Sequence, residues 1–158
     1  GTLGFQLDGA DVSLARTTVT TPESVDLHRL LALMRDRGAE AVGMEVSSHA
    51  MALRRVEPVL FDVAGFTNLS PEHLDFHHDM TDYFEAKAAL FTPQRTRAAV
   101  VCVDDPAGVR LAERIRGTDV VLRTLAWDTA ADYRIVDARH RRVEVATPTG
   151  RLVFELGE

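Results

Sequence analysis

Apolar positions along the chain follow two periodicities, and together these predict alternating strands and helices. Short continuous apolar runs are typical of buried strands, whereas apolar residues three or four positions apart are typical of helices with one buried face. The runs predict strands over residues 41–46, 60–66, 98–103 and 119–126. Helical spacing predicts helices over residues 22–37, 80–91 and 107–116. This alternation predicts an α/β fold with a parallel sheet and flanking crossover helices.

Residue types at the helix ends predict where two of the helices begin. Thr21 is the expected N-cap of the first helix, followed by Pro22 at the first helical position. Gly38 is the expected residue just beyond its C-terminus, because glycine adopts a positive φ without strain. Asp79 or Thr81 is the expected cap of the helix that follows the second predicted strand.

The C-terminal part of the chain has a different pattern. Polar and apolar positions alternate over residues 133–136, 142–145 and 151–154, and short turns separate these segments. Such alternation favours an antiparallel meander with one face toward water. We therefore expect one domain, in which residues 1–128 form the α/β part and residues 129–158 form a small antiparallel appendage.

Charge and composition exclude several classes of function. The 158 residues carry 18 Lys and Arg against 24 Asp and Glu, which gives a formal net charge of −6 at pH 7. This acidic balance argues against a nucleic-acid partner, which would need a basic face. No apolar run approaches the roughly 18 residues of a membrane span, so no membrane insertion is expected. The single cysteine, Cys102, excludes an internal disulfide and a multi-cysteine zinc site.

Glu45 is an unexpected charge at the end of the apolar run 41–46. Ser47, Ser48 and His49 follow it directly. In parallel sheets, ligands bind beyond the carboxyl ends of the strands, so this group of side chains could hold a divalent ion or an anionic ligand. The alternative is structural: a serine caps a helix and Glu45 is merely solvated.

A second cluster of polar residues lies between the second strand and its helix. His73, Asp75, His77, His78 and Asp79 are five potential metal ligands within seven positions. Imidazole and carboxylate ligands suit magnesium, manganese or zinc, so a metallohydrolase site is one hypothesis. The alternative is a solvated loop whose histidines and aspartates cap helix ends.

Lys87 lies on a mostly apolar helix. Burial favours the neutral amine of a lysine, and a neutral amine can add carbon dioxide to become a carbamate. The alternative is a lysine whose aliphatic stem is buried and whose ammonium group reaches water.

Several ordered motifs give these residues a common context. They are Thr20–Glu23, Met44–His49, Arg55–Val56, Phe66–Ser70, His73–Asp75, His77, Asp79–Met80, Tyr83, Glu85–Lys87 and Leu90–Phe91. In this order and at these separations they resemble the central domain of the Mur ligases, over residues 1–116. The β appendage fits the same domain, a P-loop-like α/β fold.

The resemblance implies an ATP-dependent ligase of peptidoglycan precursor synthesis in the bacterial cytoplasm. Its tripeptide-forming branch adds meso-diaminopimelate or L-lysine to UDP-N-acetylmuramoyl-L-Ala-D-Glu through an acyl phosphate, with Mg²⁺ and ATP. By matching position, Glu45 and His73 would help to hold magnesium, and Lys87, as a carbamate, would place a second ion. These three residues would be the catalytic ones. The residues implied to contact the UDP-muramoyl-dipeptide are Thr20, Thr21, Ser47 and Arg55.

The chain departs from the family pattern in several places, which include Leu53, where a polar residue is common, and Pro71-Glu72, where Arg-Asp is usual. It contains no Gly-Thr-x-Gly-Lys-Thr-Thr loop to cradle the ATP phosphates, so no ATP-binding residue is assigned. Cys102 stands where the family usually has asparagine. We expect the chain to be a fragment that lacks the N- and C-terminal domains of its parent and is inactive alone. The alternatives are a related ligase of the folylpolyglutamate or cyanophycin type, or a non-catalytic metal- or ligand-binding domain.

Overall fold

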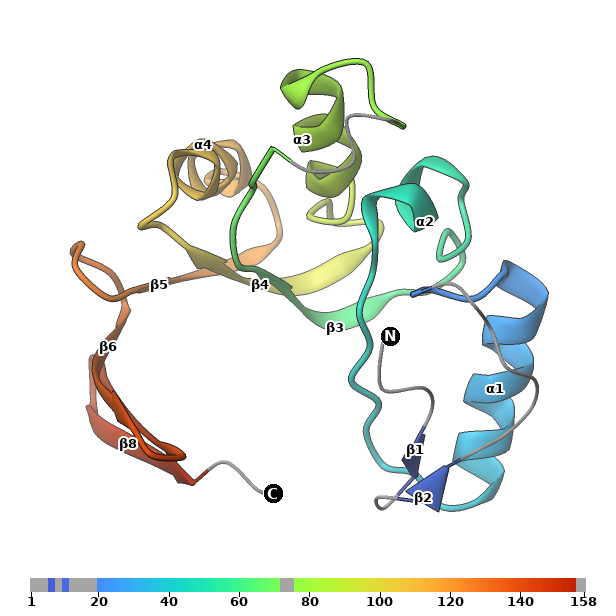
Figure 1. Cartoon of the computed structure of the whole chain (residues 1–158), viewed down its shortest axis with the longest axis horizontal. Helices are drawn as coiled ribbons and strands as arrows, with labels where there is room; N and C mark the ends of the chain where they lie inside the picture. Colours follow the sequence, from blue (N-terminus) through green and yellow to red (C-terminus); the bar gives the residue numbers. More distant parts are fainter. Residues whose placement is uncertain (1–5, 8–9, 12–19, 72–75, 156–158) are drawn as a thin grey trace.

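A six-stranded mixed sheet forms the centre of the protein (Figure 1). The computed structural model describes residues 6–7, 10–11, 20–71 and 76–155. The strands, in their order across the sheet, are β3 (Phe61–Phe66), β4 (Thr96–Cys102), β5 (Val121–Ala126), β6 (Tyr133–Arg139), β7 (Arg142–Thr147) and β8 (Gly150–Glu155). Strands β3 to β6 pair in parallel, and β6 to β8 pair antiparallel. The predicted α/β fold, with a parallel sheet and an antiparallel addition, is confirmed.

The antiparallel strands extend the parallel sheet directly. Leu125 of β5 pairs with Tyr133 of β6, and Ala126 pairs with Arg134, so the backbone ladder passes from one part to the other without a break. Figure 1 shows β6 to β8 curving away from the plane of the first three strands.

Helices α3 (Met80–Ala88) and α4 (Pro106–Ile115) cover one face of β3, β4 and β5 (Figure 1). Their apolar sides and the sheet share one buried core, whose members include Phe84, Leu111 and Val101. Asp105 caps α4 by accepting the Ala107 N–H at 2.7 Å. Gly108 brings α4 close to β4, because a Cβ there would lie 1.8 Å from the Cys102 carbonyl oxygen. Among the described residues, no helix has the length and apolarity that crossing a membrane requires.

Helix α1 (Ser24–Asp36) begins later than the sequence predicts. Glu23 is its N-cap and makes no side-chain capping bond. The predicted cap, Thr21, is fully buried, and its hydroxyl bonds to residues 45 and 47 instead. The Thr21 hydroxyl therefore makes tertiary hydrogen bonds instead of capping the helix that follows it. The C-terminal prediction is confirmed: Gly38 has φ +89°, its N–H bonds to Arg35, and the next N–H bonds to Met34, which is a Schellman closure.

The predicted strand over residues 41–46 is wrong, because this segment has no regular secondary structure. A strand needs a neighbouring backbone to take up its N–H and C=O groups. In the described part of the chain β3 forms the edge of the sheet, and the only further strands are the short antiparallel pair β1 (Gln6–Leu7) and β2 (Ala10–Asp11). The segment leads instead into the short helix α2 (Ser48–Ala52).

Candidate functional site

A pocket of about 650 Å³ opens at the carboxyl end of β3, the edge where parallel sheets bind their ligands. It is lined by Thr20, Met44, Glu45, Val46, Ser47, Ser48, His49, Met51, Leu53, Arg55, Gly65, Phe66, Thr67, Asn68, Tyr83, Lys87 and Phe91. The predicted site residues that share this lining are Thr20, Glu45, Ser47, Arg55 and Lys87. Thr21 lies behind the wall, fully buried. His73 lies outside the described residues.

Thr21 holds the Glu45–Ser48 segment of the pocket wall in place. Its hydroxyl donates to the Glu45 carbonyl at 3.0 Å and accepts the Ser47 N–H at 3.2 Å. The Ser47 side chain in turn caps α2 by accepting the Ala50 N–H. The backbone of this irregular segment is thus fixed by side chains, while the Glu45 carboxylate remains exposed at the pocket.

Arg55 is a nearly buried cation at the same pocket. Its guanidinium donates to the Thr21 carbonyl at 3.1 Å and pairs with the Glu23 carboxylate at 2.6 Å. The buried Nε finds no acceptor among the described residues. A buried guanidinium with donor capacity left over is suited to a phosphate or carboxylate ligand.

Lys87 comes from the last turn of α3 and is half-buried. Its Nζ lies 5.3 Å from the ring centroid of Tyr83, within the range of a cation–π contact. It is the only lysine in the sequence, in which every other fixed positive side-chain charge is an arginine. Arginine stays protonated in proteins, whereas lysine can become a neutral nucleophilic amine, so the pocket holds the one cation capable of amine chemistry.

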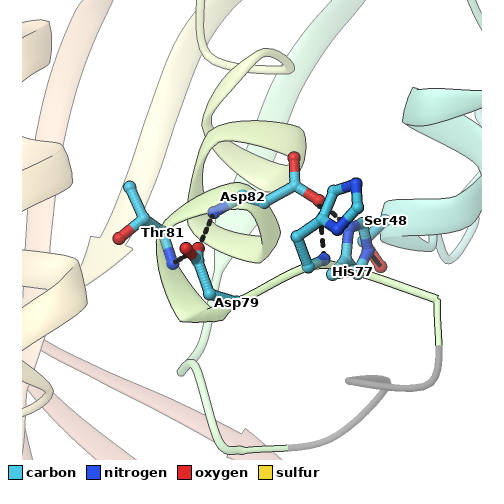
Figure 2. Close-up of polar contacts among 6 residues, drawn as sticks. Ser48, His77, Asp79, Thr81 and Asp82 are labelled. Carbon is cyan, nitrogen blue, oxygen red and sulfur yellow. Dashed lines mark hydrogen bonds and ion pairs between the residues drawn. The ribbon is translucent and has the colours of Figure 1, made fainter.

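His77 is buried beside the pocket, and both of its ring nitrogens have partners. Nε2 lies 2.9 Å from the Ser48 hydroxyl, and Nδ1 lies 3.3 Å from the Asp82 carboxylate (Figure 2). The backbone N–H of His78 is the largest cause that lowers the pKa of Asp82, and the hydrogen bond from His77 adds to it. Asp79, as one of the two predicted caps, accepts the N–H groups of residues 81 and 82 at the start of α3.

The hypothesis of a metallohydrolase site gains no support from the described part of the polar cluster. His77 has no ring nitrogen to spare, and Asp79 is engaged as a helix cap. Over residues 20–71 and 76–155, no three His, Cys, Asp or Glu side chains gather in a way that could hold a metal ion. His73 and Asp75 lie outside the described residues.

Sequence reasoning gave no site role to three polar residues that the structure brings to the pocket. Thr67 and Asn68 follow β3 and line the pocket, although they entered the sequence analysis only as part of the Phe66–Ser70 motif. Tyr83 also lines it, although it entered the sequence analysis only as part of the predicted helix 80–91 and of the family motifs. Placement at the carboxyl end of a strand was the signal that could have found the first two.

Asp104 organises a second loop, at the ends of β4 and β5. Its carboxylate accepts the backbone N–H groups of Trp127, Asp128 and Thr129 at 2.6, 3.3 and 3.2 Å. These bonds, the one from Trp127 first, lower the pKa of Asp104. The half-buried Cys102 has its Sγ 4.0 Å from the same carboxylate.

Comparison with known proteins supports a single family. A family model described as the Mur ligase middle domain matches residues 1–157. A relative from Streptomyces coelicolor is 64% identical over 115 residues, which are 73% of this chain and 22% of the relative. A relative from Geobacter metallireducens is 57% identical over 145 residues, 87% of this chain and 27% of the relative. Both are named UDP-N-acetylmuramoyl-L-alanyl-D-glutamate--2,6-diaminopimelate ligase.

A solved structure under the same enzyme name has a similar fold. Its TM-score is 0.69 at 26% identity, and the match covers 82% of this chain and 28% of that one. A relative of the same name from Corynebacterium glutamicum, 43% identical, matches 96% of this chain and 30% of its own length. The chain thus spans less than a third of each of these proteins.

Proposed function

The chain belongs to the Mur ligase family, whose middle domain it matches over residues 1–157, and from this we propose that it is the central catalytic part of a longer ATP-dependent ligase. The ligase joins an amino acid to UDP-N-acetylmuramoyl-L-Ala-D-Glu, a step of peptidoglycan precursor synthesis in the cytoplasm. Because the relatives from Streptomyces, Geobacter and Corynebacterium are named for 2,6-diaminopimelate, we assign that amino acid, rather than L-lysine, to this protein.

The observation that carries the proposal is the composition of one pocket. A carboxylate (Glu45), a guanidinium (Arg55), the only lysine (Lys87) and hydroxyls (Thr20 and Ser47) line the same cavity at the carboxyl end of β3. Carboxylate activation by ATP brings several anionic groups together, so such a site needs cations and metal-organising oxygens.

The donor set at the pocket suits magnesium in such a site. Magnesium is usually held by one or two carboxylates plus substrate phosphates and waters, so a dedicated cluster of three protein ligands is not required. Glu45 supplies a carboxylate, Asn68 can supply an amide oxygen, and Lys87 would supply two oxygens as a carbamate. His73 would add an imidazole ligand. Bound magnesium would offset the repulsion between the ATP phosphates and the carboxylate of the UDP-muramoyl-dipeptide.

The side chains of the pocket have separable roles in this reaction. Arg55 would pair with an anionic group of the UDP-muramoyl-dipeptide, and Thr20 and Ser47 would orient it by hydrogen bonds. Thr21 would act through the backbone of residues 45–47, which its hydroxyl fixes. The neutral amine of Lys87 would attack carbon dioxide and lose a proton, so that a misplaced positive charge becomes a carboxylate-like metal ligand.

Phosphate release by the full-length parent protein tests the proposal. We expect release only with ATP, magnesium, UDP-N-acetylmuramoyl-L-Ala-D-Glu and diaminopimelate together, and a slower reaction with L-lysine. The 158-residue chain alone contains no Gly-Lys-Thr phosphate loop, so it should give no turnover above a heat-denatured control. A parent protein that binds the nucleotide substrate without releasing phosphate would instead indicate a non-catalytic binding domain.

A further inference from the structure

His77 does not line the pocket, but it connects the two segments that form its walls. One wall is the segment Glu45–Ser48, and the other is the part of α3 that carries Tyr83 and Lys87. His77 is 3% exposed and lies just before α3. Figure 2 shows its ring between Ser48, the first residue of α2, and Asp82, in the first turn of α3. A buried imidazole with both nitrogens bonded is fixed in position and in orientation, because turning the ring would break both contacts.

The direction of these hydrogen bonds follows from the chemistry of their partners. Ionised Asp82 can only accept, so His77 Nδ1 carries a hydrogen and donates it. In the neutral ring, Nε2 is then an acceptor, and the Ser48 hydroxyl donates to it across 2.9 Å. With the ring neutral, the bonds run in one order, from Ser48 to His77 to Asp82.

Further contacts connect His77 to Lys87, on the α3 side of the pocket. The His77 ring stacks on Tyr83 with centroids 5.0 Å apart and planes inclined by 22°. The Tyr83 ring also contacts Lys87, whose Nζ lies 5.3 Å from its centroid. A continuous series of contacts thus joins Ser48 on one wall to Lys87 on the other.

The opposite end of this series is tied to Glu45. Ser48 directly follows Ser47, whose N–H bonds to the same Thr21 hydroxyl that holds the Glu45 carbonyl. Ser48 and Glu45 are only three residues apart, so a displacement of Ser48 would also displace Glu45. A displacement of Tyr83 would likewise move Lys87.

We propose that His77 is a positioning residue, which sets the placement of Lys87 relative to the Glu45–Ser48 segment through Ser48 on one side and Tyr83 on the other. The effect on catalysis rests on the proposed ligase function, whereas the mechanical coupling of the two walls does not. A histidine that only filled the core would tolerate any substitution that preserved packing.

Two substitutions in the full-length parent protein separate positioning from packing. The amide of glutamine reaches the place of Nε2, so His77→Gln keeps a partner for Ser48. The amide of asparagine reaches only the place of Nδ1, so His77→Asn keeps Asp82 and releases Ser48. His28→Asn on α1 is the matched control, because His28 is exposed.

The kinetic measurements are kcat, the KM of each substrate and the magnesium concentration for half-maximal rate. For His77→Asn we expect kcat to fall roughly 10- to 100-fold, because small misplacements of catalytic groups carry costs of this size. The half-saturating magnesium concentration should rise, while the KM of ATP stays unchanged. His77→Gln should recover most of kcat. Equal losses for the two variants, in proportion to their loss of thermal stability, would overturn the proposal.

Hydrogen–deuterium exchange measures the coupling without any activity. His77→Asn and Ser48→Ala should both speed amide exchange on both walls, in residues 45–50 and 83–88. Faster exchange confined to the wall that carries the substitution would overturn the proposal. A parent protein without ligase activity would refute the proposed function, and the exchange data would still decide the role of His77.

Discussion

The hydroxyl of Thr21 and the backbone carbonyl of Glu45 lie 3.0 Å apart, although 24 positions separate the two residues in the chain. The same hydroxyl accepts the N–H of Ser47, so one buried oxygen satisfies two backbone groups of an irregular segment. Thr21 has the sequence signature of a helix cap, but its hydroxyl instead holds the segment of the pocket wall that carries Glu45 and Ser47.

Replacing Thr21 with valine should loosen the Glu45–Ser47 segment, because it removes both hydrogen bonds that hold this segment in place. The substitution preserves shape and leaves the Glu45 carbonyl and the Ser47 N–H without their buried partner, which costs about 1–3 kcal/mol. Urea unfolding of the parent protein should show the loss, and the KM of the UDP-muramoyl-dipeptide should rise. Thr21→Ser keeps the hydroxyl and is the control; if it behaved like Thr21→Val, packing rather than the hydrogen bonds would be responsible.

Arg55 should be intolerant even of lysine. Its planar guanidinium reaches Thr21 and Glu23 at once and keeps a buried Nε for a ligand, a geometry that an ammonium group cannot reproduce. We expect Arg55→Lys to raise the KM of the UDP-muramoyl-dipeptide by roughly tenfold or more, the size of one charge-assisted hydrogen bond. The exposed neighbour Arg54 provides the control, and an equal effect of Arg54→Lys would argue for a general charge effect.

Lys87 should be needed for its amine and not for its charge. If it acts as a carbamate, Lys87→Arg and Lys87→Met should both lower kcat by about 10²–10³, typical of losing one preorganised electrostatic group. The parent enzyme should also slow in carbon-dioxide-free buffer and recover with bicarbonate. An active Lys87→Arg variant, or a wild-type rate indifferent to bicarbonate, would contradict this role.

Gly108 should be required for the packing of α4 on β4. A Cβ at this position would lie 1.8 Å from the Cys102 carbonyl oxygen, so the helix must move to accept alanine. We expect Gly108→Ala to lower the free energy of unfolding by about 1–3 kcal/mol or more, as overpacked cores do. Gly43 has open space around it and a φ outside the left-handed region, so Gly43→Ala should leave urea unfolding nearly unchanged.

Asp104 should make stability depend on pH in the acid range. The N–H groups of residues 127–129 lower its folded-state pKa below the ordinary value of 3.8. Because the folded pKa is depressed, the stabilisation is present above the ordinary value and is lost as the pH falls through the folded value. Thermal unfolding between pH 6 and pH 2 should therefore show a smaller acid-dependent loss for Asp104→Asn than for wild type. Asp119→Asn, at an exposed carboxylate, should keep the wild-type profile.

Most regular elements could be predicted because their signals are local. The runs over residues 60–66, 98–103 and 119–126 contain β3, most of β4 and β5, and the alternating segments lie within β6, β7 and β8. The Asp79 carboxylate caps the start of α3, and Gly38, which adopts a positive φ without strain, closes the end of α1. The segment 41–46 failed because an apolar run is a strand only where a neighbouring backbone completes its hydrogen bonds.

The sequence by itself determined most of the regular elements, the family and the set of chemically capable side chains, because periodicity, caps and motifs are properties of short stretches. Tertiary structure alone decided which of those side chains share a pocket, since Glu45 and Arg55, which flank α2, meet Lys87 of α3 where these two helices pack together. It also decided that Thr21, a predicted helix cap, holds the Glu45–Ser47 backbone, and that His77, a candidate metal ligand, is buried between Ser48 and Asp82. Thr21 binds backbone groups more than 20 positions away, and His77 binds the distant Ser48 hydroxyl as well as the nearby Asp82 carboxylate.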